Sequence, residues 1–436
     1  MSGATPRRAL ALAALLMGAA GVALGSAGGA GGAEAPDATG PGEAEVLELD
    51  LAFFEARITR DAFAARDHAE LARLYLRRAR LSATPDADLA RAEEHAGRSL
   101  ELRTAHNREA LQVLASSLMG RHRFAEARDA AERLLAADSA SLPSRALLGE
   151  IQLELGDYAS AARTFGTLLT VRHDLAVAPR YARWEEIRGR PAEARSLLRA
   201  ALGEASSRHD MPPSQLAWFR WRLGDLALRN GRLDEAEHEL EEGLALAPGD
   251  HRLLDGLARV AAARGRWREA VGLGERAIAR VLDPATLGLL SLSYGMLGDS
   301  AASAEYERAM ATSVRSQPGS LHRAWSLFLL DRGREAPAVL AGAQEEIRTR
   351  RDVYAWDVLA WALYRAGAHR EALEASSKAL AMGTRDASLH FHAGAIAAAA
   401  GERRLARRRL NQALVINPRW HPTQPQEARA LLERLR

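Results

Sequence analysis

The stretch GRLDEAEHELEEGLALAP, from Gly231 to Pro248, decides the fold because its opening recurs along the chain. It begins with Gly and places Ala five positions later, and the same order follows Gly265, Gly367 and Gly401. A local pattern that returns at a regular interval indicates a repeat architecture, in which each copy is one supersecondary unit.

The recurring position can be followed nine times, and eight of the nine residues are glycine. Successive spacings are 34, 33, 42, 34, 33, 35, 34 and 34 residues, so a single spacing departs from a period of about 34. This regularity predicts a solenoid of stacked units. The nine anchor positions are His122, Gly156, Gly189, Gly231, Gly265, Gly298, Gly333, Gly367 and Gly401.

Small residues flank the anchors at fixed offsets. We expect each anchor to end one helix, because glycine readily takes the left-handed conformation at a helix C-terminus. Small residues five positions after and seven positions before the anchor would let the two helices approach closely. The later set is Ala127, Ala161, Ala194, Ala236, Ala270, Ala372 and Ala406, and the earlier set is Ala115, Gly149, Ala182, Gly224, Ala258, Ala360 and Gly394.

The composition agrees with an all-α protein of 436 residues. Ala, Leu, Arg and Glu dominate and favour helices, whereas runs of β-branched residues are absent. The formal net charge is +3 and no basic block stands out, which argues against nucleic acid as a partner. The chain has no cysteine, so disulfides, thiol catalysis and zinc–thiolate sites are excluded.

The N-terminal residues have the layout of a secretory signal peptide. Arg7 and Arg8 precede an apolar run from Ala9 to about Gly25, and small residues follow. We predict a signal peptide over 1–27, with cleavage as late as Ala35, and a disordered Gly/Ala/Pro-rich linker over 28–45. The protein would then be exported, periplasmic or extracellular, without an integral membrane domain; an uncleaved N-terminal membrane anchor is the alternative.

The repeat resembles the tetratricopeptide repeat (TPR). The residues that carry the resemblance are Trp356, Leu359, Ala360, Gly367, Ala372 and Ala379, then Leu223, Gly224, Gly231, Ala236 and Pro248, then Gly394, Gly401, Ala406, Ala413 and Pro418. The resemblance implies an all-α α-solenoid, a right-handed superhelix of stacked helix-turn-helix repeats. It also implies that the first helices line a concave groove that binds protein or peptide partners.

Nine units cover about Arg108 to Asn417, and a tenth, degenerate unit is expected before them. The 42-residue spacing places extra residues around SSRHDMPPSQ, where Pro212 and Pro213 interrupt helix. We therefore predict an N-terminal sub-array over 46–205, a loop and joint over 206–216, and a C-terminal sub-array over 217–418. Residues 419–436 would form a capping helix from about Gln426.

Catalytic signatures are absent from the sequence. The chain contains no GxxxxGK[ST], HExxH or GxSxG, and GLGERA at Gly272–Ala277 lies inside a predicted helix rather than after a strand. His390 and His392 are two residues apart, which directs them to different helix faces. We predict a non-catalytic protein without cofactor or metal.

By resemblance, two clusters of first-helix residues are groove candidates. Aromatic and arginine side chains are typical of interface hot spots. The alternative is that the aromatic residues pack on neighbouring helices and bind nothing. The candidates are Trp218, Trp221, Asp225, Arg229, Arg252, Asp255 and Arg259, and then Arg323, Tyr354, Asp357, Trp361, Tyr364, Arg365 and Phe391.

The predicted function is an exported scaffold that binds a protein or peptide partner in its groove. One alternative is a structural component of an envelope assembly, built through an outer face such as the arginine-rich GERRLARRRLNQ at 401–412. Another is an accessory subunit of an enzyme or transport system, or a carbohydrate or small-molecule handler. Homo-oligomerisation stays open.

Overall fold

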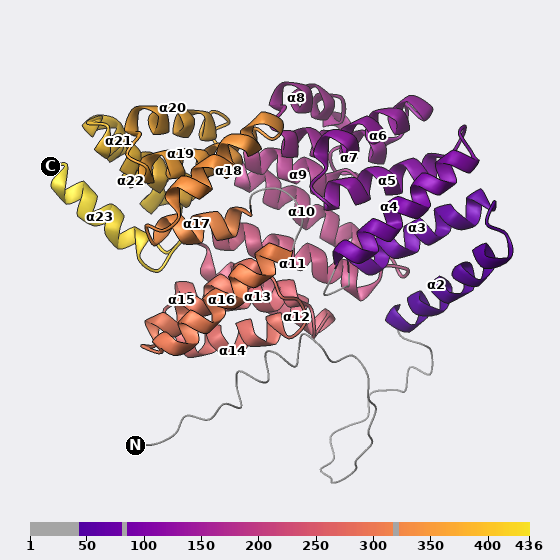
Figure 1. The fold of residues 1–436 in the computed structure, drawn as a ribbon, viewed down its shortest axis with the longest axis horizontal. Helices are drawn as coiled ribbons and strands as arrows, with labels where there is room; N and C mark the ends of the chain where they lie inside the picture. The colour runs from indigo at the N-terminus through magenta and orange to yellow at the C-terminus, as the bar shows by residue number, and fades with distance from the viewer. Residues whose placement is uncertain (1–42, 81–84, 317–321) are drawn as a thin grey trace, which may run out of the picture. The chain divides into compact units, whose positions relative to one another are not determined.

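The computed structural model describes residues 43–80, 85–316 and 322–436 (Figure 1). The predicted signal peptide and most of the predicted linker lie outside these residues. The described residues contain α-helices, one short 3₁₀ helix (Leu169–Val171) and no strand, so the predicted all-α class is confirmed. The linker prediction over 28–45 extends too far, because helix already begins at Glu43.

The helices follow one another with short connections. Their bounds are α2 (Glu43–Arg60), α3 (Ala65–Ala79), α4 (Pro85–Leu102), α5 (Arg108–Gly120), α6 (Phe124–Ala137), α7 (Leu142–Leu155), α8 (Tyr158–Thr167), α9 (Ala178–Ile187), α10 (Pro191–Ser206), α11 (Pro213–Arg229), α12 (Leu233–Leu246), α13 (His251–Ala263), α14 (Trp267–Ile278), α15 (Pro284–Met296), α16 (Ser300–Ser316), α17 (Arg323–Asp331), α18 (Ala336–Thr349), α19 (Val353–Arg365), α20 (His369–Ala379), α21 (Ala387–Ala399), α22 (Arg403–Ile416) and α23 (Gln424–Arg434).

Residues Leu47–Arg436 form one compact unit, and the description below concerns this unit. From α3 onward the helices pair as α3/α4, α5/α6 and so on to α21/α22, and α23 follows the last pair (Figure 1). The pair α3/α4 is the expected degenerate unit. The predicted solenoid of helical hairpins is therefore confirmed.

The anchor residues close the first helix of each pair. Gly156 takes φ 74°, and its N–H donates to the carbonyl of Leu153 at 3.0 Å, while the Asp157 N–H donates to Gln152 at 2.9 Å. These bonds satisfy carbonyls that would otherwise be left open at the helix end. All nine predicted anchors have positive φ; at the one anchor that is not glycine, His122, φ is 58°.

The small residues lie where the two helices of a pair touch. Ala236 is fully buried, and a Cβ added to Gly224 would come within 2.6 Å of Leu240. A Cβ on Gly394 would likewise come within 2.7 Å of Leu410. A larger side chain at these positions would push the two helices apart, as predicted from the pattern.

Some boundaries differ from prediction. The expected loop over 206–216 is shorter, because Pro213 begins α11; proline is tolerated there since the first helical N–H has no intrahelical partner. The final helix begins at Gln424 rather than Gln426, with Pro425 in its first turn. Helix α2 had no predicted counterpart.

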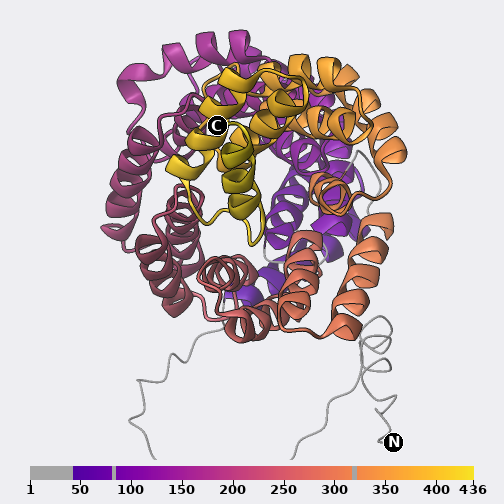
Figure 2. The ribbon, with the colours of Figure 1, turned by 90° about the vertical axis from the view of Figure 1, so that its left-hand side faces the viewer.

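The unit also turns back on itself (Figure 2). The C-terminal ends of α7, α9 and α11 bond to the loops before α19, before α21 and after α22, which lie about six helical pairs later in the chain. The bonded residues are 189 to 197 positions apart in the sequence. Contacts at this separation mean that the interior of the array is bounded by successive turns of the solenoid. The bonds run from the Arg351 N–H to Leu155 O at 3.0 Å, from Thr384 Oγ1 to Ile187 O at 2.6 Å, and from Asn417 Nδ2 to Leu228 O at 3.0 Å.

Candidate functional site

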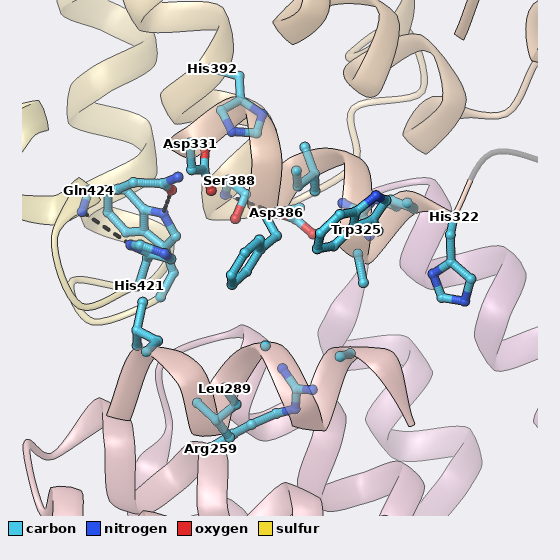
Figure 3. Close-up of a pocket in the computed structure, with 18 of the residues that line it drawn as sticks. Arg259, Leu289, His322, Trp325, Asp331, Asp386, Ser388, His392, His421 and Gln424 are labelled. Atoms are coloured by element: carbon cyan, nitrogen blue, oxygen red, sulfur yellow. Dashed lines mark hydrogen bonds between the residues drawn. The ribbon is translucent and has the colours of Figure 1, made fainter. Parts of the chain in front are cut away.

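A cavity of roughly 1250 Å³ lies inside the array, and we call it the interior cavity. Its walls come from α11, α13, α15, α17, α18 and α21 and from the segment 417–424. In Figure 3, Arg259 and Leu289 lie on one side, and Ser388, His392 and Gln424 lie on the other. The first helices of several pairs thus face one common space that is open to solvent on part of its boundary.

Aromatic rings form part of the wall. Trp325 stacks on Phe328 with ring centroids 5.6 Å apart, and the guanidinium of Arg332 lies 3.6 Å from the Phe328 ring centroid. The Trp420 indole N–H donates to Gln424 Oε1 at 2.8 Å, which fixes the orientation of both side chains. These rings offer a preformed apolar surface to a ligand.

A buried charge network supports the α9–α11 side of the cavity. Arg222 Nη2 donates to Glu186 at 2.5 Å, and both Arg222 and Arg229 bond to Asp225. Burial alone would raise the pKa of Glu186, but Arg222, Arg229 and Arg183 lower it below its usual value. Burial would also raise the pKa of Asp225, and Arg229 and Arg222 again lower it. Both carboxylates are therefore held in their charged forms.

Arg350 connects the turn-to-turn contact to the cavity that it lines. Its Nη2 lies 3.1 Å from Glu154 Oε2 on α7, and its Nε lies 2.5 Å from Asp352 Oδ2. Burial raises the pKa of Glu154 in spite of this arginine. One side chain thus joins two solenoid turns and the cavity wall.

His392 is the most enclosed polar residue of the wall, with 1% of its surface exposed. Its Nδ1 lies 2.9 Å from Asp357 Oδ1, and its ring stacks on Trp361 at 4.3 Å between centroids. Within the described residues, Nε2 has no hydrogen-bond partner. Burial would lower the pKa of His392, but Asp357 raises it above its usual value.

Five predicted groove residues reach this interior. Asp225, Arg229, Arg259 and Arg323 line the interior cavity, and Tyr354 lines an adjoining pocket of about 370 Å³ together with three of them. The guanidinium of Arg323 lies 4.3 Å from the Tyr354 ring centroid. The structure therefore brings parts of both predicted clusters to one place.

Other predicted groove residues are engaged within the protein. Asp357, Trp361 and Phe391 are buried, and the Trp361 indole N–H donates to Asp331 at 3.0 Å. Tyr364 stacks on Trp361 at 4.8 Å, with Arg365 5.9 Å from the Trp361 ring.

In the first cluster, the predicted residues also contact one another. Arg252 lies 5.6 Å from the Trp221 ring centroid, and Trp218 lies 6.5 Å from Trp221. Asp255 pairs with Arg259 at 2.6 Å and accepts from the Thr286 hydroxyl at 2.8 Å.

Sequence reasoning missed Ser388, His392, Trp420 and His421, which all line the cavity. Ser388 and His392 are four residues apart on α21, a spacing that places both on one helix face and could have drawn attention to them. Trp420 and His421 belong to the segment after Pro418, which looked only like a connection to the cap. No group of three potential metal-ligating residues occurs in the part of the chain that the structure describes.

Comparison with known proteins supports the repeat. Two tetratricopeptide-repeat family models match, one over residues 113–172 and one over residues 187–260. No curated protein matches the chain. None of the described helices is both long and apolar enough to cross a membrane.

Solved structures with some similarity are helical proteins named for varied roles. The Cut9–Hcn1 heterotetramer of APC/C matches at 13% identity over 90% of this chain and 93% of that chain, with a TM-score of 0.35. Yeast Tom70 matches at 10% identity over 90% and 92%, with a TM-score of 0.39. PilW, a type IV pilus biogenesis factor, matches at 18% identity over 58% and 94%, with a TM-score of 0.33. Over residues 113–172 and 187–260 the chain is therefore similar to the tetratricopeptide-repeat family, and its described helices form the solenoid that this similarity implies.

Proposed function

We propose that this chain is an exported, non-catalytic scaffold that binds a protein or peptide partner in its interior cavity. The observation that carries the proposal is the cavity itself, which Arg259 and Arg323 of the predicted groove line together with Trp325 and Trp420. Tryptophan, tyrosine and arginine are enriched among the few residues that carry most of the binding energy at protein interfaces.

The wall is held in place before any partner arrives. Glu186 and Asp225 fix Arg222 and Arg229, and the Trp420–Gln424 bond fixes the tail segment. A preorganised surface loses less side-chain entropy on binding, so more of the contact energy contributes to affinity.

A cavity-filling variant tests the proposal. Ser388 lies on the cavity wall of α21 (Figure 3), so Ser388→Trp would occupy the space that a partner needs. Ser377 on α20 is exposed, and Ser377→Trp adds the same side chain away from the cavity. We expect pull-downs from the native host to lose their partners with Ser388→Trp and keep them with Ser377→Trp. Equal recovery by both variants would exclude the cavity as the binding site.

Export is the second part of the proposal and rests on Arg7, Arg8 and the apolar run from Ala9 to about Gly25. We expect N-terminal sequencing of the protein from cells to begin after Ala27, or as late as after Ala35. An intact Met1 in the membrane fraction would instead indicate the uncleaved anchor.

A structural role in an envelope assembly is the second candidate function. It is favoured by α22, the second helix of the last pair, where Arg404, Arg407 and Arg408 are exposed. If this face builds an assembly, light scattering should show stable self-association that Arg407→Glu/Arg408→Glu abolishes. A monomer under all conditions would count against this role.

A further inference from the structure

We infer that the interior cavity accepts an acidic peptide segment, whose side-chain carboxylates meet hydrogen-bond donors that the protein leaves unused. The inference rests on the proposed function and specifies the chemistry of its partner.

The carboxylates of the wall are already paired within the protein. Each of the five carboxylates that line the cavity has a partner inside the protein, so none needs a cationic ligand. Asp225 bonds to Arg222 and Arg229, Asp331 accepts from Trp361, Glu345 pairs with Arg348, Glu346 pairs with Arg350, and Asp386 accepts from the N–H groups of Ser388 and Leu389.

Several donors of the same wall are not occupied. The Nε–H groups of Arg229 and Arg323, two arginines of the cavity wall, are buried and have no hydrogen-bond partner among the described residues. Arg332 and Arg419 also line the cavity, and both are exposed to solvent. Neither forms an ion pair within the described part of the chain, so a ligand can pair with both. A buried donor without a partner is unfavourable, and a ligand that brings anionic oxygens would satisfy it with a charge-assisted bond.

The balance of charge points to a moderately acidic ligand. Six arginines line the cavity against five carboxylates, which gives only a small excess of positive charge. A polyphosphate would meet five fixed carboxylates, whereas a peptide with spaced carboxylates can place its charges beside the free donors. The six arginines are Arg229, Arg259, Arg323, Arg332, Arg350 and Arg419.

Size and surface favour a peptide over a small anion. The volume of roughly 1250 Å³ exceeds the usual range of about 300–1000 Å³ for pockets that hold one small molecule. Trp325, Phe328 and Trp420 add apolar wall that a small carboxylate would leave uncovered. An extended segment of several residues uses both the donors and the rings.

Four fluorescein-labelled octapeptides test the inference by fluorescence anisotropy with the full chain. They are amidated (Ala-Glu)₄, (Ala-Gln)₄ and (Ala-Lys)₄, and (Ala-Gln)₄ with a free carboxyl terminus. We expect (Ala-Glu)₄ to bind at least tenfold more tightly than the other three. Because the interaction depends on charge, its affinity should fall as salt increases from about 50 to 500 mM.

Matched arginine variants locate the site. Arg332→Gln/Arg419→Gln should weaken (Ala-Glu)₄ binding about tenfold, since about 1.4 kcal/mol corresponds to a tenfold change in Kd. The control Arg407→Gln/Arg408→Gln removes two exposed arginines of α22 and should change the Kd less than twofold. Ser388→Trp should abolish binding.

Each other outcome overturns the inference. Equal or tighter binding of the neutral or basic amide would show that carboxylates are not what the cavity recognises, and equal binding of the free carboxyl terminus would indicate end recognition. Binding that survives both Arg332→Gln/Arg419→Gln and Ser388→Trp would lie elsewhere, and failure of all four peptides would remove the acidic segment. None of these results would change the pull-down comparison, so the proposed function would be judged separately.

Discussion

At the residue scale, the anchor glycines have two different requirements. All share positive φ, but Gly189 also faces the next turn of the solenoid, where an added Cβ would lie 2.0 Å from the carbonyl oxygen of Gly383. Gly401 has φ 83° and nothing within 4 Å of an added Cβ. Gly189→Ala should therefore lose about 1–3 kcal/mol more stability than Gly401→Ala, because only it forces backbone apart. Urea unfolding of both variants measures the difference. Equal losses of unfolding free energy would mean that the backbone at Gly383 moves away from the added Cβ without an energetic cost.

The His392–Asp357 pair makes stability depend on pH. Asp357 raises the folded-state pKa of His392 above the unfolded value of about 6.5. The stabilisation is thus complete below pH 6.5 and is lost as the pH rises through the higher folded value. Between pH 6 and pH 8.5 the wild type should lose more free energy of unfolding than Asp357→Asn, in which the pair is absent. Parallel pH profiles for the two proteins would show that His392 does not titrate as described.

Residue roles could be predicted where they are local. Positive φ at Gly231 and burial of Ala236 follow from the geometry of one hairpin, which the sequence displays directly. Trp361 could not be assigned in the same way, because its burial depends on Asp331 and His392 from neighbouring pairs. A residue on the first helix of a pair can face either the cavity or the first helix of the next pair. The repeat pattern does not distinguish these two orientations.

At the scale of elements, the helical pairs were predictable and the exceptions have local causes. α3 and α4 are joined by a longer connection without the glycine anchor, and they correspond to the degenerate unit expected before the regular repeats. α2 has neither an anchor nor a partner helix of the repeat type, so nothing in the periodic pattern indicated it. Pro213 looked like a helix breaker but begins α11, because its missing N–H is no loss at the first helical position.

The junction between α9 and α11 depends on a buried ion pair, and this gives an element-scale prediction. Glu186 on α9 meets Arg222 on α11, with side-chain exposures of 7% and 10%. Glu186→Gln leaves three arginines without its charge and should cost about 3–5 kcal/mol at pH 7. Adding Arg222→Met should restore part of this loss.

The exposed Glu193 on α10 provides the matched control, since Glu193→Gln should change the free energy of unfolding by less than about 0.5 kcal/mol. Urea unfolding at pH 7 compares all three proteins. A loss from Glu186→Gln no larger than that of Glu193→Gln would show that the pair does not stabilise the junction.

At the scale of the whole unit Leu47–Arg436, the contacts between successive turns were not predictable. Each hairpin fixes only a small rotation relative to its neighbour, and these rotations add up over several pairs before distant turns can meet. Glu154 and Arg350 are 196 residues apart, and neither belongs to a sequence motif that predicts a contact with the other. The interior cavity depends on these contacts, which is why the sequence indicated groove residues but not a bounded space.

The turn-to-turn contacts can be weakened without touching the hairpins. Thr384 and Asn417 each donate a side-chain bond to a backbone carbonyl of the earlier turn. The variant Thr384→Val/Asn417→Ala removes both donors. It leaves the Ile187 carbonyl without its side-chain partner, whereas the Leu228 carbonyl keeps the Gly231 N–H, so the total cost should be about 1.5–4.5 kcal/mol. The helical content should persist, because each pair contacts its sequence neighbours, but the two turns should separate.

Because the chain has no cysteine, two introduced cysteines can carry unique spin labels. Ala192 and Arg385 are exposed and flank the contact between Ile187 and Thr384. Pulsed electron paramagnetic resonance of Ala192→Cys/Arg385→Cys should give one narrow distance in the parent, and a longer, broader distribution with Thr384→Val/Asn417→Ala. Adding Thr312→Val/Asn411→Ala instead, at two exposed positions, should leave the distance unchanged. A narrow distance that survives loss of both donors would mean that the remaining contacts, such as the Arg350–Glu154 pair and the Arg351–Leu155 bond, are enough to hold the turns together.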